Sequence, residues 1–320
     1  MNKGLEIELN ILITGGTGFI GSTLAIALSK LNFKITLYDI NKKNKFYTEY
    51  SNISFIHGDT NDTKKLVSLC KENNFDGVIH LAAVSRVVVA QNNQEECIRT
   101  NVKGTQSLLK AIELASLKNT PWLIFGSSRE VYGEPKELPV LETFEKKYVN
   151  IYGDSKIQGE NMFNNFAKQH NSSAIVLRFA NVYGNQFDLL DRVIPRFIKA
   201  ITNSTELTIE GGEQVIDFTH IDDTIDTIIK TINYISTSSQ IIDDFHILPG
   251  VGWSLYDAID YLEEHLDTKA KIKVNEKRDF DVERFIGDPT KIKNILQSRK
   301  FLDLKEGLKL AIPQYIKVMN

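Results

Sequence analysis

Short apolar runs alternate with longer amphipathic stretches through the first half of the chain. Six of these runs are rich in β-branched residues, as buried strands are, and they cover residues 11–14, 34–39, 53–58, 76–82, 121–128 and 174–179. Ala25, Leu28 and Leu31 mark the apolar face of one intervening helix, and the spacing predicts longer helices around 93–118 and 148–170. Apolar strands separated by helices predict an α/β fold, namely a doubly wound parallel sheet with helices on both faces.

The alternation loosens after about residue 185, where prolines and glycines interrupt it. We therefore expect a first domain over residues 1–184 and a smaller mixed C-terminal lobe over residues 185–320. Segments near 214–235 include an apolar run typical of a strand, and we expect them to rejoin the first domain. The expected fold is thus a large parallel-sheet domain followed by a substrate-binding lobe.

Composition narrows the class of partner. The 320 residues carry a net charge of −3, which gives no electrostatic reason to bind nucleic acid or an anionic membrane. No stretch of about 18 apolar residues is present, so we expect no membrane span. The two cysteines, Cys70 and Cys97, form no metal-binding or disulfide pattern and suit a reducing cytoplasm.

A glycine-rich loop lies between the first strand and the first helix. Gly16, Gly18 and Gly21 fit the pattern G-x-G-x-x-G, and Gly15 precedes them. In this context glycine allows a tight turn and lets a pyrophosphate approach the backbone at a helix N-terminus. The alternative is a tight turn that holds no ligand. The loop favours a dinucleotide site of the Rossmann type.

Asp39 is the last residue of the second predicted strand. Its separation in sequence from the glycine-rich loop is close to that at which dinucleotide sites of this type carry a carboxylate. A carboxylate there accepts hydrogen bonds from both ribose hydroxyls and repels a 2′-phosphate, so it favours NAD over NADP. The alternative for Asp39 is an ordinary turn residue at a strand end.

Tyr152 and Lys156 lie four residues apart on the predicted helix 148–170, and so share one face of it. A free tyrosine has a pKa of about 10 and is a poor base at neutral pH, but a nearby cation stabilises the phenolate. Such a pair also arises by chance in a chain of this length, and its weight comes from its position after Ser128. Tyr148, one turn earlier, has no lysine four residues later.

Taken together, ten motifs in order resemble the extended short-chain dehydrogenase/reductases, in their NAD-dependent nucleotide-sugar epimerase/dehydratase branch. They span most of the chain and read TGGTGFIG (14–21), YDIN (38–41), HGDTND (57–62), VIHLAA (78–83), NVKGT (101–105), SSREVYGE (127–134), YGDSK (152–156), LRFANVYG (177–184), RVIPRFI (192–198) and QVIDFTHIDD (214–223).

The resemblance implies roles for individual residues. Ser128, Tyr152 and Lys156 would be catalytic, with Tyr152 as general base and acid. The residues implied to bind NAD are Gly15, Gly18, Phe19, Ile20, Gly21, Asp39, Asn41, Asp59, Thr60, Leu81, Ala82, Ala83, Asn101, Tyr152 and Lys156. Those implied to bind the substrate are Arg86, Arg129, Glu130, Asn181, Arg192 and Arg278.

Two positions depart from the family pattern. Ile216 stands where the family often has an arginine that grips the diphosphate, so Arg192, Arg196 or Arg86 would have to substitute. Arg129 replaces the first of two acidic residues that dehydratases carry, whereas Glu130 remains. Arg129 could read a carboxylate or hydroxyl of the sugar, or it could simply pair with Glu130.

The resemblance favours an NAD-dependent epimerase of a nucleotide-linked sugar, similar to the UDP-glucose 4-epimerases and acting through a transient keto intermediate. Alternatives are a 4-keto sugar nucleotide reductase, a nucleotide-sugar decarboxylase or dehydratase, and a cofactor-binding scaffold without catalysis. The family also implies a homodimer formed through the two long helices. No metal site is expected, since His220, Asp222 and Asp223 are explained by the start of a helix.

Overall fold

The computed structural model describes residues 9–42, 45–297 and 300–319. The outermost residues of the two predicted domains, 1–8 and 320, lie outside this range. The chain divides into two compact units. Unit 1 contains the chain up to Ser127 together with Ser155–Leu177 and Ile228–Asp244, and unit 2 contains Ser128–Asp154, Arg178–Thr227 and the chain from Phe245.

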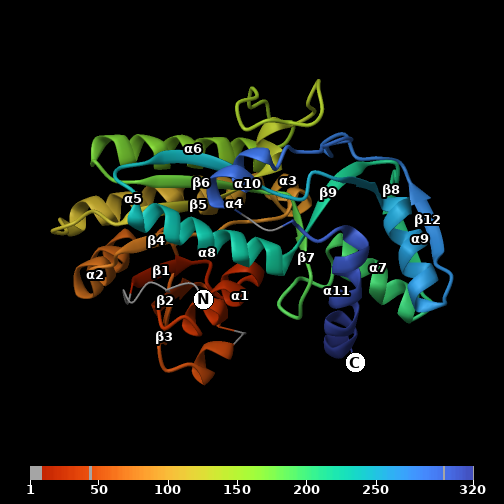
Figure 1. Ribbon diagram of the computed structural model, residues 1–320, viewed down its shortest axis with the longest axis horizontal. Coiled ribbons are helices and arrows are strands. Elements are labelled where there is room, and N and C mark those ends of the chain that lie inside the picture. Colours follow the sequence, from red (N-terminus) through yellow and green to blue (C-terminus); the bar gives the residue numbers. More distant parts are fainter. Residues whose placement is uncertain (1–8, 43–44, 298–299, 320) are drawn as a thin grey trace. The chain divides into compact units, whose positions relative to one another are not determined.

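A seven-stranded sheet forms the centre of unit 1 (Figure 1). In spatial order its strands are β10 (Ile242–Ile247), β6 (Ala174–Phe179), β5 (Trp122–Ser128), β4 (Gly77–His80), β1 (Asn10–Thr14), β2 (Lys34–Asp39) and β3 (Ile53–His57). The strands from β5 to β3 pair in parallel. All six strands predicted from apolar runs are present, and the predicted fold class is confirmed.

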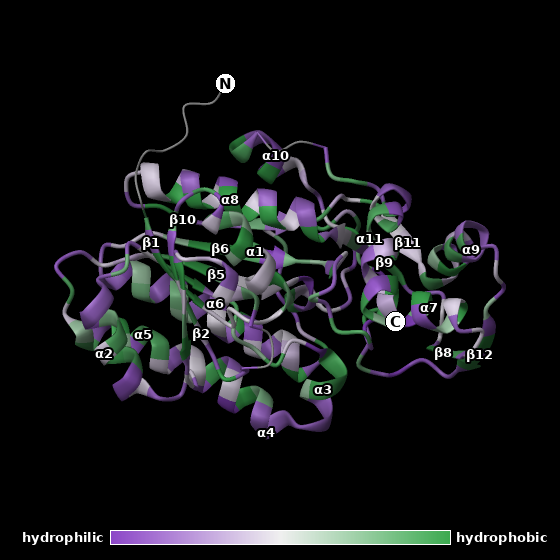
Figure 2. Cartoon of the chain, turned by 90° about the horizontal axis from the view of Figure 1, so that it is seen from below, coloured by the Kyte–Doolittle hydropathy of each residue, from purple (hydrophilic) through white to green (hydrophobic). Residues whose placement is uncertain are grey.

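Helices cover both faces of this sheet (Figure 2). One face carries α2 (Thr63–Asn73), α5 (Gly104–Ala115) and α6 (Ile151–Gln169), and the other carries α1 (Phe19–Ser29) and α8 (Ile221–Thr237). Shorter helical segments are η1 (Phe46–Glu49), α3 (Val87–Asn92), α4 (Gln94–Cys97) and the π-helix η2 (Ile98–Lys103).

Two sequence expectations for the helices need correction. The helix predicted over 93–118 is three consecutive segments, α4, η2 and α5, because the hydrogen-bond spacing widens to that of a π-helix at its centre. The sequence pattern predicts that Leu31 belongs to the apolar face of the first helix. In the structure α1 ends at Ser29, and Leu31 is 51% exposed in the following turn. Ala25 and Leu28 are buried, as predicted.

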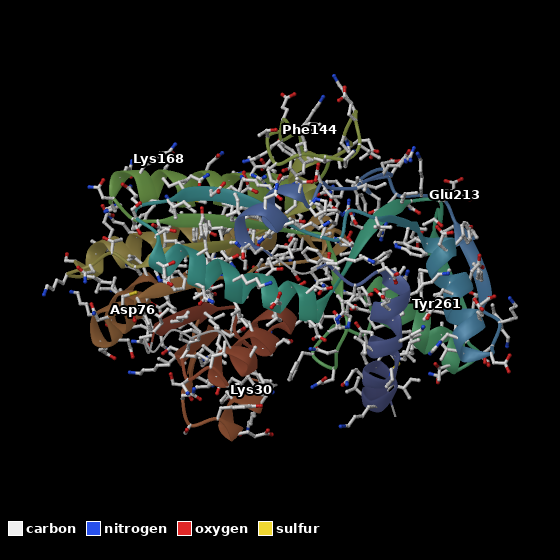
Figure 3. The ribbon with its side chains drawn as sticks, in the orientation of Figure 1. Lys30, Asp76, Phe144, Lys168, Glu213 and Tyr261 are labelled. Atoms are coloured by element: carbon white, nitrogen blue, oxygen red, sulfur yellow. The ribbon has the colours of Figure 1, made fainter. Side chains whose placement is uncertain are left out.

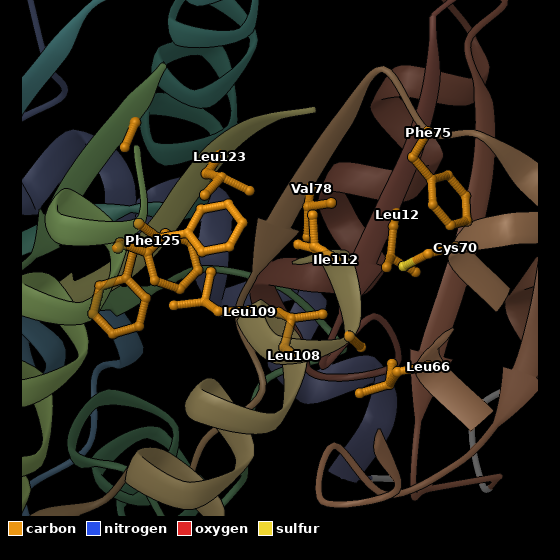
Figure 4. Close-up of a cluster of buried hydrophobic side chains, with 14 of the residues drawn as sticks. Leu12, Leu66, Cys70, Phe75, Val78, Leu108, Leu109, Ile112, Leu123 and Phe125 are labelled. Atoms are coloured by element: carbon orange, nitrogen blue, oxygen red, sulfur yellow. The ribbon is translucent and has the colours of Figure 1, made fainter. Parts of the chain in front are cut away.

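The core of unit 1 joins the sheet to α2 and α5 (Figure 4). Leu12, Val78 and Leu123 point from three neighbouring strands toward Leu66 and Leu108 of the helices, and all five side chains are fully buried. The burial of each of these side chains contributes roughly 1.5–3 kcal/mol to the stability of the fold. Charged side chains take the outer positions, as Lys30 and Lys168 do at the ends of α1 and α6 (Figure 3).

Unit 2 is built from two small sheets and surrounding helices. One sheet has the order β11 (Gly252–Ser254), β9 (Val215–His220), β7 (Asn181–Tyr183), and the other pairs β12 (Lys271–Asn275) with β8 (Glu206–Glu210). The helical elements are η3 (Arg129–Tyr132), α7 (Val193–Thr202), α9 (Leu255–Leu266), α10 (Thr290–Leu296) and α11 (Leu304–Met319). Strand β9 pairs within unit 2, and the segment that returns to unit 1 is Ile228–Asp244.

None of the helices in the described ranges has both the length and the apolar character needed to span a membrane.

Candidate functional site

The glycine loop is shaped by close contacts at Gly15, Gly16 and Gly21. A Cβ on Gly15, which has a φ of +69°, would lie 2.6 Å from the Ala82 nitrogen, and one on Gly21 would lie 2.4 Å from the Gly15 oxygen. Gly18 differs, because it is exposed and a Cβ there would meet only the Gly15 oxygen, at 3.2 Å. In α1, whose residues are all described, no side chain caps the N-terminus that starts at Gly18. The loop therefore leaves backbone space at the helix N-terminus, which suits a pyrophosphate.

Asp39 is half-buried at the end of β2 and faces this loop. Its two carboxylate oxygens accept hydrogen bonds from the backbone nitrogens of Thr17, at 3.0 Å, and Asn41, at 2.9 Å. Each oxygen retains a further acceptor position, so the carboxylate can still receive two hydroxyl groups. This geometry fits the ribose role implied for Asp39.

Asp59 lies in the loop that follows β3 and is held by two neighbours, Asn61 of the same loop and Arg99 of η2. Its carboxylate accepts from the Asn61 nitrogen at 2.9 Å and from Arg99 Nη1 at 2.8 Å. Burial alone raises the pKa of Asp59, but these hydrogen bonds and the Arg99 charge lower it overall. The sequence analysis missed Arg99, since nothing in the local pattern showed that the π-helix would bring it to Asp59.

Asn101 lies in the π-helix η2 and is buried. Its side chain accepts from the Val84 nitrogen at 2.7 Å and donates to Ser155 Oγ at 3.0 Å. It thereby links the loop that follows β4 to helix α6. Single-turn π-helices often occur at functional sites. Asn101 fits the position beside the cofactor that the resemblance implies, and the segment Leu81–Ala83 runs into the same loop.

Lys156 is 4% exposed and lies on α6. Its Nζ donates to the Gly126 oxygen at 2.7 Å and lies 5.0 Å from the centre of the Phe125 ring. Burial lowers the pKa of Lys156 to about 8, against the opposing effects of Cys97 and Glu160. The ammonium is therefore easily deprotonated for a lysine, and its charge depends on its surroundings.

In unit 2, Arg129 and Glu130 follow Ser128 in the short helix η3. Ser128 Oγ accepts from the Glu130 nitrogen at 3.2 Å, which leaves its proton available for donation. Arg129 Nη2 lies 2.9 Å from Glu130 Oε1, and Arg129 Nε donates to Asn181 Oδ1 at 3.2 Å. The two charged side chains thus pair with each other, one of the two alternatives left open by the sequence.

Asn150 fixes the start of α6 to η3. Its Nδ2 donates to Glu130 Oε2 at 2.8 Å, and its Oδ1 accepts from the Gly153 nitrogen at 2.9 Å. Tyr152 lies in this first turn and is 8% exposed, and Lys156 follows four residues later on the same helix. The sequence analysis missed Asn150, although an asparagine just before a helix is a common capping signal.

The remaining arginines are held by different neighbours. Arg192 lies 3.8 Å from Asp188, and Arg278 donates to Asp281 at 2.7 Å. Arg196 Nε is buried and has no hydrogen-bond partner among the described residues. Burial lowers the pKa of Arg196, and the Arg278 charge adds to this effect. Arg86 precedes α3 in unit 1.

Ile216 is buried in the apolar core of unit 2, where Trp253 of β11 is its partner in the strand register. An arginine at this position would have to enter that core. The departure from the family pattern is thus accommodated by packing.

The chain matches a family model, curated relatives and solved structures over most of its length. The model of the NAD dependent epimerase/dehydratase family matches residues 11–242. A relative described as probable UDP-arabinose 4-epimerase 3 from Oryza sativa subsp. japonica is 26% identical over 94% of this chain and 81% of its own length.

Solved structures are also similar over nearly the whole chain. A UDP-glucose 4-epimerase from Thermotoga maritima with UDP-glucose is 27% identical, with a TM-score of 0.88 over 98% of this chain and all of that one. A UDP-glucuronic acid 4-epimerase from Bacillus cereus, in complex with UDP-glucuronic acid and NAD, is 27% identical, with a TM-score of 0.87 over 97% of this chain and all of that one.

Proposed function

Because the chain belongs to the NAD dependent epimerase/dehydratase family, we propose that it is an NAD-dependent epimerase of a nucleotide-linked sugar. We further propose that it inverts C4 of a UDP-sugar. The relatives and solved structures described above are named as UDP-sugar 4-epimerases, and they match this chain over more than nine-tenths of its length.

The residues of unit 1 fit NAD. Gly18 offers open backbone at the N-terminus of α1, and Asp39 retains acceptor positions for ribose hydroxyls. A carboxylate at this position disfavours the 2′-phosphate of NADP. When bound, NAD supplies a reversible hydride acceptor. We assign the cofactor to unit 1 and the sugar nucleotide to residues of unit 2, among them Asn181 and Arg278.

The chemistry of the chain rests on three side chains. Tyr152 removes the proton from the sugar hydroxyl that is oxidised, and returns it when the keto group is reduced again. Ser128 donates a hydrogen bond to the same sugar oxygen. Lys156 supplies the positive charge that makes the phenol a better base.

The contacts of Glu130 favour epimerisation over decarboxylation or dehydration as the proposed reaction. Both of its carboxylate oxygens are engaged, one by Arg129 and the other by Asn150, and the side chain is buried. A carboxylate held in this way is poorly placed to give or take a proton. Glu130 therefore acts to orient its neighbours in this proposal.

We also propose a cytoplasmic homodimer formed through α5 and α6. Leu114 of α5 is 48% exposed, as a residue covered by a partner would be in the isolated chain. Cys70 and Cys97 are buried and no disulfide joins them, which suits a reducing compartment. Leu114→Glu should shift the mass measured by light scattering from dimer to monomer, and an unchanged dimer would contradict this interface.

The test of function is incubation of the purified protein with UDP-glucose, UDP-arabinose and UDP-glucuronic acid without added cofactor. We expect at least one of them to give its C4 epimer at unchanged mass, as read by NMR and mass spectrometry. Loss of carbon dioxide would instead show a decarboxylase. Turnover of keto sugars that requires added NADPH would show a reductase.

A further inference from the structure

Helix α6 carries a buried carboxylate, one turn beyond Lys156, that the mechanism above does not use. Glu160 is 0% exposed, and Ser127 Oγ donates to its Oε1 at 2.5 Å. This short hydrogen bond ties the carboxyl group of Glu160 to β5. Ser127 immediately precedes Ser128 at the end of β5, so Glu160 contacts the strand end that bears this serine.

Several neighbours besides Glu160 surround the charge on Lys156. Its hydrogen bond to the Gly126 oxygen and its contact with the Phe125 ring come from neutral groups of β5. His80 of β4 interacts with it electrostatically, and Cys97 of α4 favours the ammonium even more strongly than Glu160 does. Burial lowers the pKa of His80 to about 3, so it is neutral at physiological pH and adds no repelling positive charge.

A buried ammonium needs an opposite charge to remain protonated. Glu160 lies at position i+4 from Lys156 on the same helix, within reach for side-chain interaction. It acts on Lys156 in the direction that favours the ammonium.

We propose that Glu160 is a positioning residue that keeps Lys156 charged and anchors the end of β5 through Ser127. This inference rests on the proposed role of Lys156 in activating Tyr152. It predicts that the negative charge of Glu160, and not its hydrogen bond with Ser127, sets the pH range over which the enzyme works.

Two single variants separate charge from hydrogen bond. Glu160→Gln removes the charge and can still accept from Ser127, whereas Ser127→Ala removes the hydrogen bond and keeps the charge. We expect the pH profile of kcat to narrow in Glu160→Gln. Its alkaline limb should move down by ~1 pH unit as Lys156 loses its proton earlier, whereas its acidic limb should not move up, because Lys156 is protonated at acidic pH in both proteins.

In Ser127→Ala we expect a lower kcat with both limbs in their wild-type positions. Glu160→Asp keeps the negative charge, so both limbs of its pH profile should also stay in their wild-type positions. This variant can be measured if Glu160→Gln does not fold. A profile of wild-type shape for Glu160→Gln, scaled down uniformly, would overturn the proposal in favour of a purely structural role.

Titration of the Lys156 ammonium by NMR, with Lys156→Arg to assign the signal, gives a readout apart from activity. We expect the proton to be lost at lower pH in Glu160→Gln than in the wild type. An unchanged titration would overturn the proposal even if activity fell. Conversely, a wild-type protein that epimerises no UDP-sugar would refute the proposed function and leave the titration result to decide the role of Glu160.

Discussion

At the scale of single residues, the phenol of Tyr152 is the group on which turnover depends. Tyr152→Phe keeps the ring, which is 8% exposed, and removes only the hydroxyl. General acid–base catalysis is worth about 10²–10⁴-fold, so kcat should fall by that order while the NAD content of the purified protein stays at its wild-type level. Epimer formation by NMR and the absorbance of released cofactor measure the two quantities.

Tyr148→Phe is the matched control, since Tyr148 lies just before α6 and is 51% exposed. It should turn over at the wild-type rate. Equal losses in the two variants would show that the hydroxyl of Tyr152 has no special role.

Arg129 offers a second prediction at this scale, about stability. Arg129 and Glu130 form an ion pair, and their side chains are only 10% and 8% exposed. Arg129→Met leaves a buried carboxylate without its cation, and breaking such a pair costs about 3–5 kcal/mol. The pair of Lys110 and Glu113 is exposed, so Lys110→Met should leave the denaturation midpoint almost unchanged. Urea denaturation would measure both, and similar midpoints for the two variants would contradict the prediction.

At the scale of elements, two glycines in the turn from β1 to α1 distinguish a packing role from a role in binding NAD. Gly21→Ala places a methyl group 2.4 Å from a backbone oxygen, so the loop has to move and both the melting temperature and the NAD content should fall. Gly18→Ala meets much less resistance, because its Cβ would lie 3.2 Å from the same oxygen. We expect Gly18→Ala to lose NAD, while its melting temperature differs little from that of the NAD-free wild type. Retention of NAD in Gly18→Ala would show that the cofactor does not approach this backbone.

The elements themselves were largely predictable, because a run such as 174–177 is apolar throughout and is typical of a strand that is buried on both faces. The π-helix was not predictable, since its hydrogen-bond shift leaves no mark on the hydrophobic period. Contacts between distant residues, such as Arg99 with Asp59 or Ser127 with Glu160, also escaped the sequence. The roles of the candidate residues came from the motifs, and they remain predictions for the experiments above.

At the scale of the whole molecule, buried titratable groups make stability depend on pH in opposing ways. Burial raises the pKa of Asp188 to about 6 and that of Asp217 to about 7, so the stability from these two groups is lost as pH rises toward those values. His80 acts in the opposite sense. Burial lowers its pKa to about 3, so its contribution is present above the unfolded pKa of about 6.5 and is lost as pH falls below it.

His80→Gln isolates the histidine's share of this dependence. His80 is bonded on both ring nitrogens, to Thr14 at 2.5 Å and Thr105 at 2.9 Å, so it stays neutral in the fold while the unfolded chain takes up a proton. Between pH 7.5 and pH 5.5 the wild type should therefore lose about 1.4 kcal/mol more unfolding free energy than the variant. The aspartates are common to both proteins and cancel in this difference. Parallel stability curves from urea unfolding at the two pH values would mean that His80 is protonated as easily in the fold as in the unfolded chain.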